Sequence, residues 1–103
     1  MHVIVWQFTV REEYVEEFVS AYGADGDWEK LFRHSQGYLR TELLRSLDDP
    51  RVFLTIDRWD DPTSFETFKA QFAEEYKRLD ERFELYTSEE QKIGVFSETE
   101  TGA

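Results

Sequence analysis

Two segments of this chain read as β-strands that are apolar on both faces. Residues 2–10 place apolar side chains on either side: Ile4, Trp6 and Phe8 against Val3 and Val5. Residues 52–59 repeat the pattern: Val52, Leu54 and Ile56 against Phe53 and Trp59. An antiparallel sheet with one solvent-exposed face alternates apolar and polar residues along its strands. Because these two strands are apolar on both sides, both faces of the sheet require burial.

The helical segments are too few to cover both faces. The second face is therefore expected to pack on another sheet, most simply that of a second copy of the chain. We expect a homodimer formed through the sheet faces.

The composition limits the class of protein. A chain of 103 residues with 40% hydrophobic residues supports one folded domain. The formal net charge of -11 opposes binding to nucleic acid and to anionic membranes. The chain has no cysteine and therefore no thiolate metal site. No long apolar stretch or leader-like segment is recognisable, so an acidic cytoplasmic protein is expected.

The order of elements predicts a fold class. After the first strand, residues 12–22 have helical periodicity, and a second short helix follows around Trp28, Leu31 and Phe32. Strands are expected over residues 38–47 and 52–59, then one long helix that starts at Asp61-Pro62 and carries Phe65 to Leu79, and a short strand over residues 91–96. We place the domain at residues 1–97 and expect a disordered tail over residues 98–103.

This order is the βαββαβ arrangement of α+β ferredoxin-like folds, with an extra short helix and a four-stranded antiparallel sheet. Two such sheets packed face to face form a dimeric α+β barrel. A ligand cavity is then expected inside each protomer, between the sheet and its helices.

Three segments resemble the antibiotic biosynthesis monooxygenase (ABM) superfamily: residues 26–32 (GDWEKLF), 37–43 (GYLRTEL) and 56–59 (IDRW), the last leading into an aromatic-rich helix. The resemblance extends over about residues 2–97. It implies a cofactor-independent oxygenase acting on a phenol or dihydroquinone, although the superfamily also includes haem-degrading enzymes and proteins without a known reaction.

The resemblance transfers one site residue. Trp59 matches the tryptophan that ends the third strand in both enzyme branches. Thr55 and Phe65 stand here in place of the asparagine and tyrosine of the quinone-type branch, and Leu79, flanked by Arg78 and Arg82, lies near the position of its arginine. The haem branch is disfavoured because Gln7 stands where it has an asparagine, and no histidine lies between residues 60 and 83.

The base for such a reaction has few candidates. Asp57 shares a strand face with Thr55 and Trp59, but an aspartate at a strand end beside an arginine, here Arg58, is more often part of a structural ion pair. His34 is a second candidate, although a histidine near a helix C-terminus also complements the helix dipole; Tyr76 is a weaker one. Only two histidines, His2 and His34, are present, so a histidine-based metal site is not expected. The resemblance also implies a reaction without a bound cofactor.

The pocket is expected to be aromatic and to take a small hydrophobic aromatic ligand. Its predicted lining is Trp6, Phe8, Trp28, Phe32, Thr55, Phe68, Phe72 and Tyr76. An aromatic stripe at helical spacing also suits an ordinary core, and Trp6 or Trp59 suits a dimer interface.

Three functions remain open from the sequence. The first is an oxygenase, the second is a non-catalytic binding or regulatory protein, and the third is an isomerase or decarboxylase that needs a base but no oxygen. Oxygen uptake separates the first from the third, and ligand binding without turnover identifies the second.

Overall fold

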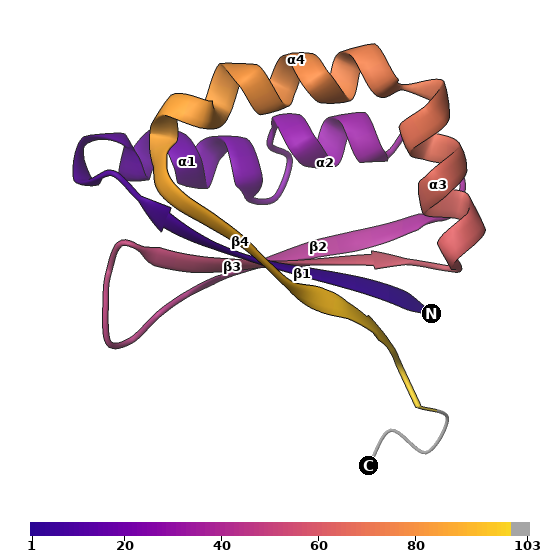
Figure 1. Ribbon diagram of the computed structural model, residues 1–103, viewed down its shortest axis with the longest axis horizontal. Coiled ribbons are helices and arrows are strands. Elements are labelled where there is room, and N and C mark those ends of the chain that lie inside the picture. The colour runs from indigo at the N-terminus through magenta and orange to yellow at the C-terminus, as the bar shows by residue number, and fades with distance from the viewer. Residues whose placement is uncertain (100–103) are drawn as a thin grey trace.

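The computed structural model describes residues 1–99. Four strands and four helices follow in order along the chain (Figure 1): β1 (His2–Val10), α1 (Val15–Tyr22), α2 (Asp27–Phe32), β2 (Tyr38–Arg45), β3 (Val52–Trp59), α3 (Pro62–Gln71), α4 (Ala73–Phe83) and β4 (Thr87–Ser97). Short 3₁₀ turns precede α1, at Glu12–Tyr14, and follow α4, at Glu84–Tyr86. This is the predicted α+β ferredoxin-like arrangement.

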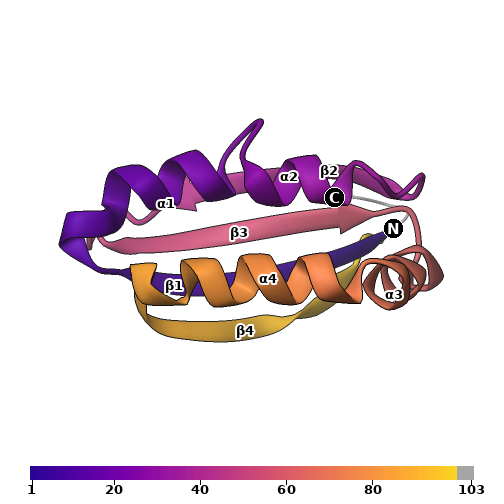
Figure 2. The same ribbon diagram turned by 90° about the horizontal axis from the view of Figure 1, so that it is seen from above.

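The strands form one antiparallel sheet in the order β2-β3-β1-β4. Helices α1, α2 and α4 lie over one face of this sheet, and α3 lies at its end (Figures 1 and 2). None of the helices in the described part of the chain is long and apolar enough to cross a membrane.

The predicted long helix is wrong in one respect, because the structure divides it at Phe72. This residue has φ -115° and ψ 32°, and α4 starts afresh at Ala73. The backbone N–H groups of Phe72 and Tyr76 still bond to the carbonyl four residues earlier, as in a continuous helix. The apolar residues therefore keep their helical spacing across the break, and the sequence pattern did not reveal it. The start was predicted correctly: Asp61 accepts a hydrogen bond from the Ser64 N–H (2.8 Å), with Pro62 in the first helical position.

Two strand boundaries also differ from the prediction. Strand β2 ends at Arg45, and Leu47 is fully exposed in the turn that follows. Strand β4 begins at Thr87 rather than at residue 91, because its polar first half pairs with β1 through backbone hydrogen bonds. An edge strand of this kind lacks the apolar alternation that identifies strands in a sequence. Within the predicted tail, Glu98 bonds to Arg58, and residues 100–103 lie outside the described residues.

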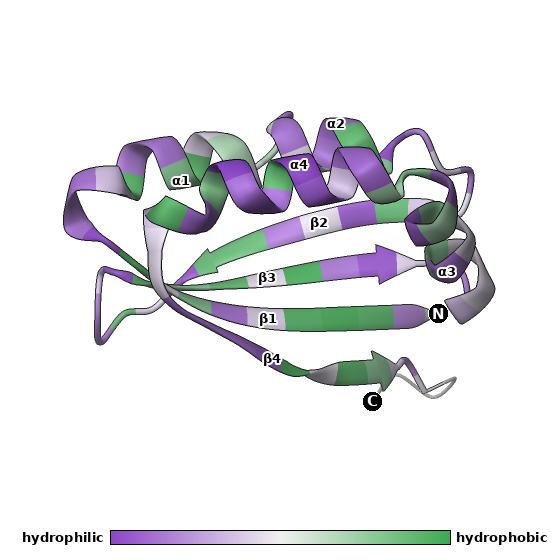
Figure 3. Ribbon diagram, turned by 45° about the horizontal axis from the view of Figure 1, so that its top comes forward, coloured by the Kyte–Doolittle hydropathy of each residue, from purple (hydrophilic) through white to green (hydrophobic). Residues whose placement is uncertain are grey.

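The core is aromatic and lies between the sheet and the helices. Five side chains are almost completely buried there: Trp59, Phe18, Phe68, Phe83 and Val10. Hydrophobic residues extend along most of β1, whereas α1 and α4 alternate between hydrophobic and hydrophilic residues (Figure 3). The helices therefore present an apolar side to the sheet and a charged side to water.

The opposite face of the sheet carries no helix within residues 1–99 (Figure 1). Strand register brings its apolar residues side by side, with Leu44 opposite Leu54 and Val3 opposite Phe96. Leu44 and Phe96 remain 47% and 50% exposed. We call this surface the outer face.

Candidate functional site

A cavity of about 270 Å³ lies between the sheet and the helices. Every strand and helix contributes to its lining, which consists of Trp6, Phe8, Tyr22, Trp28, Phe32, Thr41, Thr55, Asp57, Lys69, Tyr76, Asp80 and Glu90. Aromatic walls with a few polar groups are typical of sites for small organic molecules, and the volume is close to the lower end of their range.

The structure brings together seven of the side chains predicted for the site. The lining includes Trp6, Phe8, Trp28, Phe32, Thr55, Tyr76 and the candidate base Asp57. The other four predicted residues, Trp59, His34, Phe68 and Phe72, lie outside the lining.

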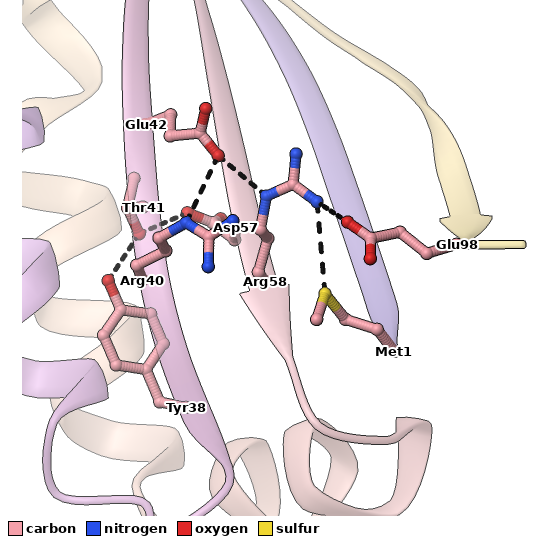
Figure 4. Close-up of polar contacts among 8 residues, drawn as sticks. All are labelled: Met1, Tyr38, Arg40, Thr41, Glu42, Asp57, Arg58 and Glu98. Atoms are coloured by element: carbon pink, nitrogen blue, oxygen red, sulfur yellow. Dashed lines mark hydrogen bonds and ion pairs between the residues drawn. The ribbon is translucent and has the colours of Figure 1, made fainter. Parts of the chain in front are cut away.

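Asp57 is held by a chain of hydroxyl groups (Figure 4). Thr41 faces Asp57 across the β2–β3 pair, and its hydroxyl donates to Asp57 Oδ1 at 2.7 Å. This bond uses the only hydroxyl hydrogen of Thr41. The Tyr38 hydroxyl, which is also 2.7 Å from Thr41 Oγ1, therefore donates to Thr41. Both bonds point toward the carboxylate and fix its orientation.

Asp57 has no cationic partner among residues 1–99. The alternative in which it pairs with Arg58 is wrong, because successive side chains on a strand point to opposite faces. Arg58 lies on the outer face, where it donates to Glu42 (2.7 Å) and to Glu98 (Figure 4). Burial raises the pKa of Asp57 to about 6, and the hydrogen bond from Thr41 offsets part of this rise. The carboxyl is therefore mostly ionised at pH 7 and is able to accept a proton.

The tyrosines around the cavity remain protonated at neutral pH. Burial raises the pKa of Tyr38 and that of Tyr76 to about 12, and it also raises the pKa of Tyr22. These hydroxyls are therefore hydrogen-bond donors rather than bases, and Asp57 is a far better base than Tyr76.

Trp59 is a core residue behind the cavity wall. Its side chain is completely buried and packs edge-on against Phe32, whose own ring lines the cavity, at a centroid distance of 5.4 Å. Its indole N–H has no hydrogen-bond acceptor among residues 1–99. Trp59 therefore supports the cavity through its packing on Phe32 and does not line it.

His34 lies on the surface, away from Asp57. It is exposed, and its ring stacks on Phe72 at a centroid distance of 5.4 Å. The structure thus separates the two residues that the sequence proposed as alternative bases.

Five lining residues were absent from the predicted pocket: Tyr22, Thr41, Lys69, Asp80 and Glu90. The pairing of Thr41 with Asp57 and that of Glu90 with Phe8 depend on strand register, which the sequence did not reveal. Asp80 had a weak signal, since it lies four residues after Tyr76 on the same helical face. In the described part of the chain, no group of three or more His, Cys, Asp or Glu side chains is arranged to hold a metal ion.

Comparisons with solved structures agree with this architecture. A cofactor-independent oxygenase from Streptomyces nogalater, SnoaB, superimposes with a TM-score of 0.70 at 21% identity, over 96% of this chain and 93% of its own. A protein from Bordetella bronchiseptica and one from Nitrosomonas europaea, both provisionally described as antibiotic biosynthesis monooxygenases, give TM-scores of 0.76 and 0.72 at 14% and 19% identity. The matches cover 95% of this chain and 96% of the Bordetella protein, and 94% of this chain and 97% of the Nitrosomonas protein. At these identities the likeness establishes the fold.

Among curated protein sequences, none matches the chain. Among protein families, the one described as antibiotic biosynthesis monooxygenase matches residues 1–82, most of the chain and six of its eight helices and strands in full. The chain therefore belongs to the antibiotic biosynthesis monooxygenase family.

Proposed function

We propose that this protein is a cofactor-independent monooxygenase that oxidises a hydrophobic phenol or dihydroquinone with O₂. The observation that carries this proposal is a carboxylate with a raised pKa, Asp57, held by Thr41 in a cavity with aromatic walls. A base in such a site can ionise a bound phenol, and family membership agrees with oxygen chemistry.

The proposed reaction balances without a metal or flavin, because the substrate supplies all four electrons. For a dihydronaphthoquinone, C10H8O2 and O₂ give C10H6O3 and H₂O. Asp57 first accepts a phenolic proton, and the electron-rich phenolate passes one electron to O₂. The two radicals then combine into a C–O bond, which gives a substrate peroxide. The peroxide oxygen takes the first proton back from Asp57 and becomes a hydroperoxide. Asp57 then removes the hydrogen on that carbon as a proton, the C–H electron pair forms the new carbonyl bond while the O–O bond breaks, and the departing hydroxide takes this second proton from Asp57 to become water.

The chain's own residues supply binding and proton transfer in this scheme. Trp6, Trp28 and Tyr76 hold the flat ring system of the substrate and exclude water. The exclusion of water strengthens electrostatic interactions inside the cavity. Thr41 keeps one Asp57 oxygen occupied. The other oxygen accepts no hydrogen bond from residues 1–99 and is free for the substrate hydroxyl.

Oxygen consumption by the metal-free protein tests this proposal, with 1,4-dihydroxynaphthalene and anthrone as substrates. Protein-dependent uptake is expected, and Asp57→Asn is expected to lower it about 100-fold, within the usual range for loss of a general base. Asp48→Asn, which alters an exposed aspartate, is the control and should retain full activity. Uptake no faster than the spontaneous rate, or equal uptake by both variants, would overturn the oxygenase assignment or the role of Asp57, respectively.

The same carboxylate also supports a second reaction class. A base in an apolar cavity can catalyse isomerisation or decarboxylation, and neither reaction needs oxygen. Product formation under anaerobic conditions would favour this alternative. A protein that binds these compounds and converts none of them would be the non-catalytic binding protein that the sequence left open.

We also propose that two copies associate through the outer face into an α+β barrel. This proposal is supported by half-exposed apolar residues on strands that no helix covers on that side, such as Leu44 and Phe96. Apolar surface of this kind in a small domain is typical of an interface. Light scattering at micromolar concentration is expected to give twice the chain mass of 12.4 kDa, and a folded monomer would refute the dimer.

A further inference from the structure

The charges around the cavity are unbalanced. Three carboxylates line it, those of Asp57, Asp80 and Glu90, against a single ammonium group, that of Lys69. The Lys69 ammonium lies 5.0 Å from the centroid of the Tyr76 ring and 5.7 Å from that of Phe65. Lys69 forms no salt bridge within residues 1–99, and its one positive charge can balance at most one of the three carboxylates.

The acids lie at two separate ends of the cavity. Asp57 pairs with Ile4 from one side of β1, and Glu90 pairs with Phe8 from the other side. Ile4 and Phe8 are four residues apart on β1, which is about 13 Å, and β3 and β4 are two strand spacings apart, which is about 10 Å. The Cα atoms of Asp57 and Glu90 are therefore about 16 Å apart. Asp80 lines the same cavity from α4, one helical turn after Tyr76. Asp57 therefore marks one end, and we call Asp80 and Glu90 the acidic end.

The acidic end has no cationic partner within residues 1–99. Both side chains are exposed at the mouth of the cavity, and Glu90 accepts one long hydrogen bond, from the Thr87 hydroxyl at 3.4 Å. Neither Asp80 nor Glu90 forms a salt bridge there, although other carboxylates of this chain do. Burial raises the pKa of Glu90, and the charge of Asp80 raises it further. Tyr76, between the two ends, has its pKa raised by burial and then by Asp80, Asp57 and Glu90. The carboxylates of both ends therefore act on the same lining residue of the cavity.

We infer that the cavity selects an aromatic molecule that carries a protonated amine, whose cation lies between Asp80 and Glu90 and whose ring lies against Trp6 and Trp28. The cation would relieve the repulsion between the two carboxylates, and the electron-rich ring faces add to its attraction. An anionic aromatic molecule is rejected by the same field. The inference rests on the proposed function only in that both place the aromatic ligand in this cavity.

Three probes of one size test this selection: 2-(1-naphthyl)ethylamine, 2-(1-naphthyl)ethanol and 1-naphthylacetate. Their dissociation constants are measured by calorimetry at pH 7.5 and low salt, and NMR shifts of the cavity residues locate the binding. The amine is expected to bind at least threefold more tightly than the alcohol and at least tenfold more tightly than the carboxylate. The preference should shrink as salt rises, because exposed charges are screened.

Variants separate this selection from general attraction to an acidic protein. Glu90→Gln and Asp80→Asn should each reduce the ratio of amine to alcohol affinity at least twofold. Glu81→Gln removes the same charge from an exposed position next to Asp80 that does not line the cavity, and it should leave the ratio unchanged.

Some results would overturn the inference. It would be overturned if 1-naphthylacetate bound as tightly as the amine, or if all three variants changed the ratio of amine to alcohol affinity equally. It would also be overturned if no probe shifted the NMR signals of the cavity residues. Failure of the oxygenase proposal has a different signature. It would appear as absent oxygen uptake with neutral dihydroquinones, while the order of the three affinities stayed as expected.

Discussion

Replacing Asp57 with asparagine should stabilise this protein at neutral pH. Asparagine has the same shape and can still accept the hydrogen bond from Thr41, but it carries no charge. The substitution therefore removes the cost of holding an ionised carboxyl inside the aromatic cavity. Stabilisation by loss of a functional group is a known property of sites that favour activity over stability.

The size of the effect follows from the pKa of Asp57, which burial raises from 3.8 to about 6. Below pH 3.8 the folded and unfolded states both hold the proton, whereas between pH 3.8 and 6 only the folded state still holds it. The stability of the wild-type protein therefore falls as pH rises through this interval. The pKa of Asp57 differs by about two units between the folded and unfolded states. This difference lowers the free energy of unfolding of the wild-type protein by roughly 3 kcal/mol at pH 7.5 and by about 1 kcal/mol at pH 4.5.

Urea unfolding followed by tryptophan fluorescence measures the difference, with wild type and variant at one protein concentration because association changes apparent stability. Asp48→Asn, at an exposed site, serves as the control and should have the same stability as wild type at both pH values. An Asp57→Asn protein that is less stable than wild type at pH 7.5, or a difference that does not change between pH 4.5 and 7.5, would refute the reasoning.

Three other predictions concern the hydroxyl chain, the outer face and the core. Thr41→Val should raise the pKa of Asp57 above about 6, because it removes a donor that favours the charged form; NMR titration of the carboxyl carbon measures this, and Thr41→Ser should restore the wild-type value. Leu54→Glu on the outer face should convert the proposed dimer to a monomer in light scattering, whereas Thr67→Glu on the exposed side of α3 should not. Trp59→Ala should cost about 3–5 kcal/mol of stability, the usual range for removing a large buried aromatic ring, and Trp59→Phe clearly less in the same urea assay, since the phenyl ring refills part of the space and the lost N–H has no partner.

The last prediction has a practical consequence for activity assays. The resemblance to the family makes Trp59 the first residue to mutate, but its complete burial makes Trp59→Ala a disruption of the core. Asp57→Asn is the more informative variant because it changes one charge in the cavity and preserves shape.

Much of the fold was predictable because local patterns determine local structure. The apolar segments over residues 2–10 and 52–59 identified β1 and β3 over the residues that the structure gives them. Asp61-Pro62 identified the start of α3, since a side-chain acceptor followed by proline suits a helix N-terminus. The break at Phe72 was not predictable, because a change in helix direction preserves the spacing of the apolar residues.

For the candidate site, the sequence by itself determined that Asp57 shares a strand face with Thr55 and Trp59, but it left open whether Asp57 lies in the pocket or pairs with Arg58. The tertiary structure placed Asp57 on the helix side of the sheet and Arg58 on the outer face. Only the tertiary structure decided that Thr41 holds Asp57, that Asp80 and Glu90 meet at the other end of the cavity, and that Trp59 lies behind its wall. The physical reason is that periodicity is a property of one segment, whereas a cavity depends on strand register and helix packing between segments far apart in the chain.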